Sequence, residues 1–91
     1  MSQTIDDYKN RLINKILLAR SQDEVKRYIA TAMKELEKHN VNGHIVDRFV
    51  DKLIQELGNL SAMDHDFLQW SNIKMARVQF NQIKLALHPA P

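Results

Sequence analysis

Cysteine is absent from this chain of 91 residues. The absence excludes disulfide bonds, thiolate metal sites and cysteine nucleophiles, and it fits a reducing compartment. Residues 1–7 are polar and acidic, whereas a secretory signal requires positive charge followed by an apolar run. The chain also lacks any stretch that approaches the ~20 consecutive apolar residues of a membrane span. We therefore expect a cytoplasmic protein without a membrane partner.

Glycine and proline are scarce, with two of each. The residues that are abundant favour helices over strands, which prefer runs of Val, Thr and Tyr. A chain this short hides only about 60 to 65% of its unfolded surface, which supports one core and not two. The composition therefore predicts a single all-α domain over residues 1–91. The expected architecture is an up-and-down four-helix bundle with a long C-terminal helix.

Apolar side chains recur at helical spacing in four segments, at about residues 5–20, 22–39, 43–57 and 62–87. Ser21 and Glu24 have the spacing of a capping box and open the second segment. A turn-forming stretch from Asn40 to Gly43 ends that segment, and Gly58 ends the third. Residues 88–91, which contain both prolines, are predicted to form a short disordered tail.

The last segment carries a continuous apolar stripe, whose members are three or four residues apart. We interpret this stripe as its contribution to the bundle core. Trp70 lies on it, and Tyr8 and Tyr28 lie on the stripes of earlier helices, so all three are interpreted as core side chains rather than ligand-stacking groups. The stripe consists of Leu60, Met63, Phe67, Trp70, Ile73, Ala76, Phe80, Ile83 and Leu87.

A second apolar row, formed by Leu68, Met75, Val78 and Leu85, lies on roughly the opposite side of the same segment. A helix that faces water on one side does not require such a row. Two interpretations stay open besides chance exposure. Either the last helix is central and wrapped by the other three, or the row binds a partner, most simply a second copy in a two-fold dimer.

Positive charge is concentrated in the same segment, although the formal net charge of the chain is only +2. After Asp66 the sequence contains Lys74, Arg77 and Lys84 and no acid, whereas residues 1–66 have ten bases and eleven acids. The three cations share one strip between the two apolar rows. The strip is interpreted as a solvated face, with binding of nucleic-acid phosphates or an acidic partner as the alternative.

A helix-turn-helix is disfavoured in the second and third segments, because the candidate recognition helix exposes acids that phosphate would repel. No catalytic constellation, metal-ligand pattern or cofactor motif is evident, so we expect a protein that is not an enzyme and has no cofactor or small-molecule substrate. Local groups of metal-compatible side chains match no specific ligand pattern. These groups are His44, Asp47 and Asp51; Glu35 and His39; and Asp64, His65 and Asp66.

The size, basic balance and four-helix layout resemble those of the small cytoplasmic immunity proteins that protect bacteriocin producers. The resemblance is one of architecture and brings no shared motif, so no functional residue is transferred from it. The sequence therefore predicts an interaction or regulatory module that associates with itself or another protein through the second apolar row. A nucleic-acid accessory role for the basic strip is the alternative, and an immunity-like role is a more remote one.

Overall fold

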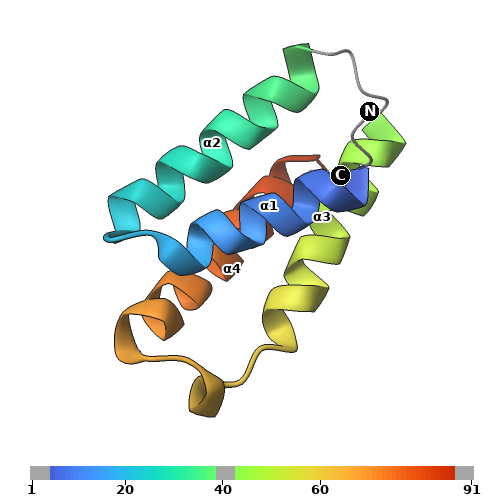
Figure 1. The fold of residues 1–91 in the computed structure, drawn as a ribbon. Coiled ribbons are helices and arrows are strands. Elements are labelled where there is room, and N and C mark those ends of the chain that lie inside the picture. The colour runs from blue at the N-terminus through green and yellow to red at the C-terminus, as the bar shows by residue number, and fades with distance from the viewer. Residues whose placement is uncertain (1–4, 39–42, 88–91) are drawn as a thin grey trace.

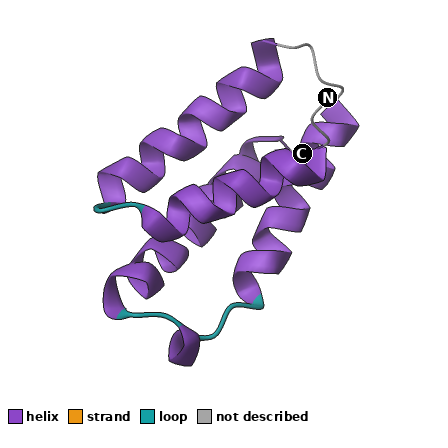
Figure 2. Ribbon diagram, viewed as in Figure 1, coloured by secondary structure: helices purple, strands orange, loops and turns teal. Residues whose placement is uncertain are grey.

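The computed structural model describes residues 5–38 and 43–87. Four α-helices account for most of these residues: α1 (Ile5–Leu18), α2 (Gln22–Lys38), α3 (Gly43–Gly58) and α4 (Phe67–Leu87). A short 3₁₀ helix, Ala62–Asp64, lies between α3 and α4. The predicted turn at residues 39–42 and the predicted tail at 88–91 lie outside the described residues. Figure 2 shows helices and connecting loops throughout the described chain.

The helices form the predicted all-α four-helix bundle (Figure 1). Successive helices run in alternating directions, and α2 and α3 lie on opposite sides of α1. Helix α4 packs against all three other helices, and α1 also contacts α2 and α3. With 21 residues, α4 is the longest of the four. Helix α4 is thus the common packing partner of the other three helices.

One hydrophobic core joins the four helices, because each contributes buried apolar side chains to the same cluster. Tyr8, Tyr28 and Trp70 are half-buried and pack against this cluster rather than inside it. The fully or nearly buried apolar residues are Leu12, Ile16, Ala19, Val25, Ile29, Ala32, Leu36, Phe49, Val50, Leu53, Leu57, Ile73, Ala76 and Phe80.

The start of α2 confirms the predicted cap. The backbone N–H of Glu24 donates to the hydroxyl oxygen of Ser21 at 3.2 Å. The Glu24 carboxylate accepts in return from the backbone N–H of Arg20 at 3.4 Å. Two N–H groups that the sharp connection from α1 would otherwise leave without a partner are satisfied in this way.

Helix α4 begins at Phe67, five residues later than the sequence predicted. Ser61 does cap a helix, but only the 3₁₀ turn: its hydroxyl accepts from Met63 N–H at 3.2 Å. The cap of α4 is Asp66, whose carboxylate accepts from Gln69 N–H at 2.7 Å, while the Gln69 side chain accepts from Asp66 N–H at 3.4 Å. This reciprocal pair, three residues apart, is the capping signal that the sequence analysis overlooked.

The later start overturns part of the predicted core stripe. Met63 and Phe67 were expected in the core, yet they are 95% and 90% exposed. Both lie before the second turn of α4, where the chain has not yet entered the space between the other helices. Leu87, at the opposite end, is 41% exposed. The stripe is buried only in its middle, at Ile73, Ala76 and Phe80 in particular, with Leu60, Trp70 and Ile83 half-buried around them.

Candidate interaction surfaces

The second apolar row of α4 faces largely outward. Leu68 is 46% exposed, Val78 51% and Leu85 71%, whereas Met75 is half-buried and packs against the core. Helix α4 therefore combines elements of both interpretations of the sequence: it contacts the three other helices, and it still leaves apolar side chains in water. A row of this kind on one helix face is a candidate interaction surface.

The three cations of the basic strip have different surroundings. Lys84 donates to the carboxylate of Asp51 on α3, and this hydrogen bond, aided by the charges of Asp51 and Asp47, raises the pKa of Lys84. Lys74 and Arg77 are exposed. With one of three cations engaged inside the molecule, the strip offers a weaker site for a polyanion than the sequence suggested, because that affinity grows with the number of phosphates neutralised.

Asn72 is fully buried on the core side of α4, a position that the sequence analysis did not single out. Its side-chain amide donates to the carbonyl oxygens of Ile16 and Ala19, at 3.1 and 2.7 Å. Ile16 lies in the last turn of α1, and its carbonyl also accepts from Ala19 N–H at 3.2 Å, whereas Ala19 directly follows the helix. A residue of the last helix therefore caps the first helix, while the Asn72 carbonyl oxygen has no hydrogen-bond partner within the described structure.

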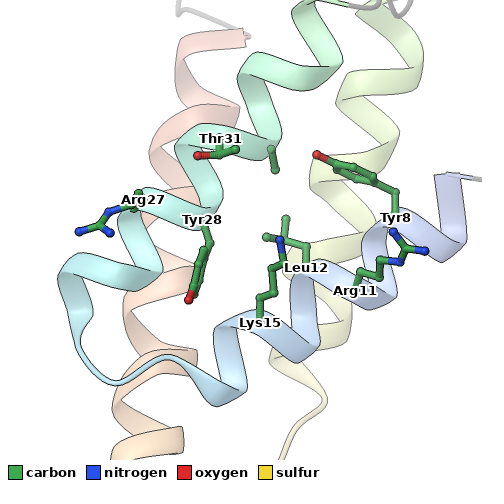
Figure 3. Close-up of a pocket in the computed structure, with 8 residues that line it drawn as sticks. Tyr8, Arg11, Leu12, Lys15, Arg27, Tyr28 and Thr31 are labelled. Carbon is green, nitrogen blue, oxygen red and sulfur yellow. The ribbon is translucent and has the colours of Figure 1, made fainter.

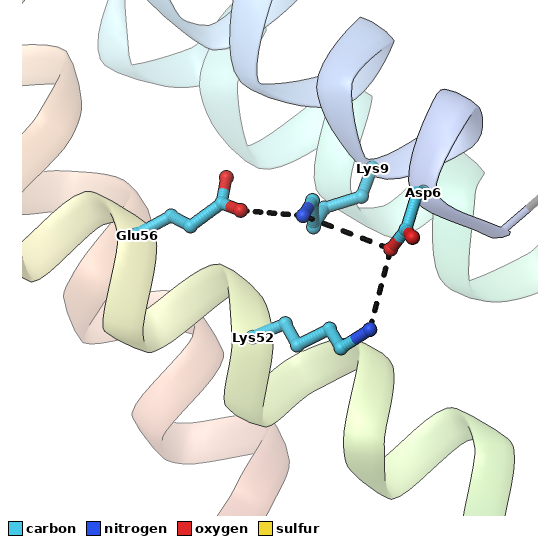
Figure 4. Close-up of polar contacts among 4 residues, drawn as sticks. All are labelled: Asp6, Lys9, Lys52 and Glu56. Carbon is cyan, nitrogen blue, oxygen red and sulfur yellow. Dashed lines mark hydrogen bonds and ion pairs between the residues drawn. The ribbon is translucent and has the colours of Figure 1, made fainter.

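Charged side chains link α1 to α3 on another side of the bundle (Figure 4). Lys9 is only 7% exposed and donates to Glu56, and its ammonium also lies 3.8 Å from the carboxylate of Asp6. The same Asp6 oxygen is 3.3 Å from the ammonium of Lys52. The network consists of two lysines and two carboxylates in alternating contact, so its charges balance within the molecule. We interpret it as a structural link between α1 and α3.

A cavity of about 300 Å³ opens between α1 and α2 (Figure 3). Tyr8 projects from α1 and Tyr28 from α2, on either side of Leu12 and Lys15. This cavity was not predicted from the sequence. The one local feature of the sequence that relates to it is the four-residue spacing of Arg11 and Lys15, which places both cations on the same side of α1. The cavity is lined by Tyr8, Arg11, Leu12, Lys15, Arg27, Tyr28, Thr31 and Ala32.

Two further findings concern residues 5–38 and 43–87. Within these ranges, no three His, Asp or Glu side chains come together in a group that could hold a metal ion. No described helix is both long and apolar enough to cross a bilayer. Of the groups noted in the sequence, the pair Glu35 and His39 includes a residue outside the described ranges.

Comparison with protein-family models, with curated proteins and with solved structures found no match to this chain.

Proposed function

We propose that the protein is a non-enzymatic interaction module that associates with a second copy of itself through the outward face of α4. The observation that supports it most directly is the exposure of Leu68, Val78 and Leu85 along one helix that otherwise supplies core residues. Transferring such side chains from water to an apolar contact is favourable by roughly 25 cal/mol per Å². A partner surface would supply that contact.

The spacing of the row favours an identical partner. Its members are separated by seven, three and seven residues, at positions 68, 75, 78 and 85. The row therefore has the same spacing from either end. A two-fold axis that crosses α4 between Ala76 and Arg77 would place Leu68 opposite Leu85 and Met75 opposite Val78 in an antiparallel pair. Interfaces of two-fold dimers have this self-complementary property.

The centre of the proposed interface is continuous with the protein core. Met75 packs against the core cluster, and its sulfur accepts a weak hydrogen bond from Gln79 at 3.8 Å. A flexible methionine adapts to a facing side chain at low cost. Leu68 and Leu85 stand about 26 Å apart along the helix axis, at ~1.5 Å rise per residue, so the row extends along most of α4.

The test is the solution mass by light scattering over a concentration series, for the unmodified chain, Leu85→Glu and Leu18→Glu. Leu18 is the matched control, because it is also an exposed leucine, at 76%, and lies on α1. We expect a dimer for the unmodified chain and Leu18→Glu, and a folded monomer for Leu85→Glu. A monomeric unmodified chain at all concentrations, or a Leu85→Glu protein that stays dimeric, would contradict the proposal.

A further inference from the structure

The α1/α2 cavity has the size and lining of a small-ligand site. Its volume of about 300 Å³ lies at the lower end of the ~300 to 1,000 Å³ typical of ligand pockets. Buried Leu12 and Ala32, 4% and 3% exposed, provide an apolar floor. Tyr8 and Tyr28 provide aromatic side walls from different helices (Figure 3). A flat apolar group would fit this combination.

Both tyrosine walls are held in place by neighbouring groups. The Tyr8 ring packs against Phe49 of α3, with 5.9 Å between centroids and a 47° tilt. The Tyr28 hydroxyl donates to the carboxylate of Glu24 at 3.2 Å. Walls that are ordered before a ligand arrives reduce the conformational entropy lost on binding. The cavity is thus a prepared site rather than a loose contact between two helices.

The charge of the lining is positive. Arg11, Lys15 and Arg27 contribute to it, and none of the eight described lining residues is acidic. The Lys15 ammonium lies 5.7 Å from the centroid of the Tyr28 ring, within the range of a cation–π contact. That contact holds the ammonium beside the aromatic wall.

Two carboxylates flank the tyrosine ends of the cavity without lining it. Glu24 accepts from the Tyr28 hydroxyl. At the other end, burial raises the pKa of Tyr8, and the nearby charge of Glu35 raises it further. Tyr8 therefore stays a neutral hydrogen-bond donor at physiological pH. Lys15 lies between the two tyrosines in Figure 3, so a negative ligand group would lie near Lys15 rather than at either tyrosine end.

We propose that this cavity binds a small aromatic carboxylate. The ring of the ligand packs over Leu12 and Ala32 between the two tyrosine rings, and its carboxylate faces Lys15. The proposal is independent of the α4 interface, because none of the residues that line the cavity belongs to α4.

The experiment is a titration with 2-naphthoate followed by ¹H–¹⁵N NMR, with the neutral analogue 2-naphthalenemethanol as the matched ligand. We expect dissociation constants of roughly 0.1 to 1 mM for the carboxylate, as is usual for ligands of this size. Shifts should concentrate on the amides of α1 and α2 around the cavity, and the alcohol should bind about tenfold more weakly. Shifts centred on α4, or equal binding of the alcohol, would overturn the proposal.

Three variants complete the test. Lys15→Gln should weaken 2-naphthoate binding about three- to fivefold, the range expected for one exposed ion pair. Thr31→Phe places a ring in the cavity mouth from an exposed position and should abolish the binding shifts while the spectrum stays that of the folded chain. Lys26→Gln removes an exposed cation of α2 that does not line the cavity, and should change nothing. Unchanged binding in both Lys15→Gln and Thr31→Phe would overturn the site.

Discussion

The buried face of α4 contains a polar residue that is typical of a surface, and its exposed face contains apolar residues that are typical of a core. The face toward the core includes a fully buried asparagine, Asn72, and the face toward water includes leucines and a valine. The amide nitrogen of Asn72 is compensated within the molecule, because it donates to carbonyls at the end of α1, while its carbonyl oxygen has no partner in the described structure. The exposed apolar groups have no such compensation within the described chain. The fold thus accounts for the amide nitrogen of the buried asparagine, and the proposed partner would account for the exposed apolar side chains.

This contrast shows why burial cannot be assigned to α4 from its hydrophobic pattern alone. Apolar residues are distributed around most of the helix, so several faces look equally suited to the core. The other helices settle which face is buried. They meet α4 along Ile73, Ala76 and Phe80 and leave its first turn and outer side uncovered.

The largest expected effect separates two phenylalanines of α4 that were predicted to share one buried stripe. Phe80 is fully buried and Phe67 is 90% exposed. We expect Phe80→Ala to lower the free energy of unfolding by about 3 to 5 kcal/mol, because it removes a large core side chain and leaves a cavity. Phe67→Ala should change it by less than about 0.5 kcal/mol. Urea denaturation at one protein concentration measures both, and similar losses would disprove the assignment of faces.

An intermediate effect is expected from the buried asparagine. Asn72→Ala removes the side-chain hydrogen bonds to the carbonyls of Ile16 and Ala19 at the end of α1. The Ile16 carbonyl keeps its hydrogen bond from Ala19 N–H, and the Ala19 carbonyl loses its side-chain donor. We expect a cost of about 1 to 3 kcal/mol of unfolding free energy. Asn81 is the control. It is an exposed asparagine of α4 that donates to the carbonyl of Arg77 at 2.9 Å, and Asn81→Ala should cost under about 0.5 kcal/mol. Equal costs would mean that the cap on α1 contributes no stability.

The smallest effect concerns Lys84, at the border between the two faces. Its pKa is raised by Asp51, so the ion pair stabilises the fold fully below the ordinary lysine pKa and is lost as pH rises through the raised value. We expect the difference in melting temperature between the unmodified chain and Lys84→Gln to be steady at pH 7 to 9 and to shrink above about pH 10.5. Lys74→Gln, at an exposed lysine, should show no such trend. A difference that persists at high pH would contradict a role for this charge.

Much of the fold was predictable from the sequence, because its helices are marked by local signals. The capping pair Ser21 and Glu24 and the scarcity of glycine indicated helical segments whose number and class the structure confirms. The start of α4 was misplaced because Ser61 caps a 3₁₀ turn five residues before Asp66 and Gln69 form the effective cap. When two capping residues follow one another closely, their spacing alone does not show which of them begins the α-helix.

The candidate sites were less predictable, since they depend on which helices meet. Arg11 and Lys15 belong to one helix, but only the packing of α1 against α2 brings Arg27 and Tyr28 to the same cavity. Asn72 likewise has no sequence signal of its role, because its partners lie 53 and 56 residues earlier in the chain. The apolar row was identified, and its role as an interface stays a prediction.

The contact between Asn72 and the end of α1 also affects when the chain can fold during translation. The ribosome makes the first helix well before Asn72, so during most of translation the carbonyls of Ile16 and Ala19 lack the side-chain donor that they have in the folded chain. The first helix cannot reach its final state until the last one docks. Helix α4 is also the element that contacts all three others. We therefore expect the nascent chain to acquire its native packing in one late step, rather than helix by helix from its beginning.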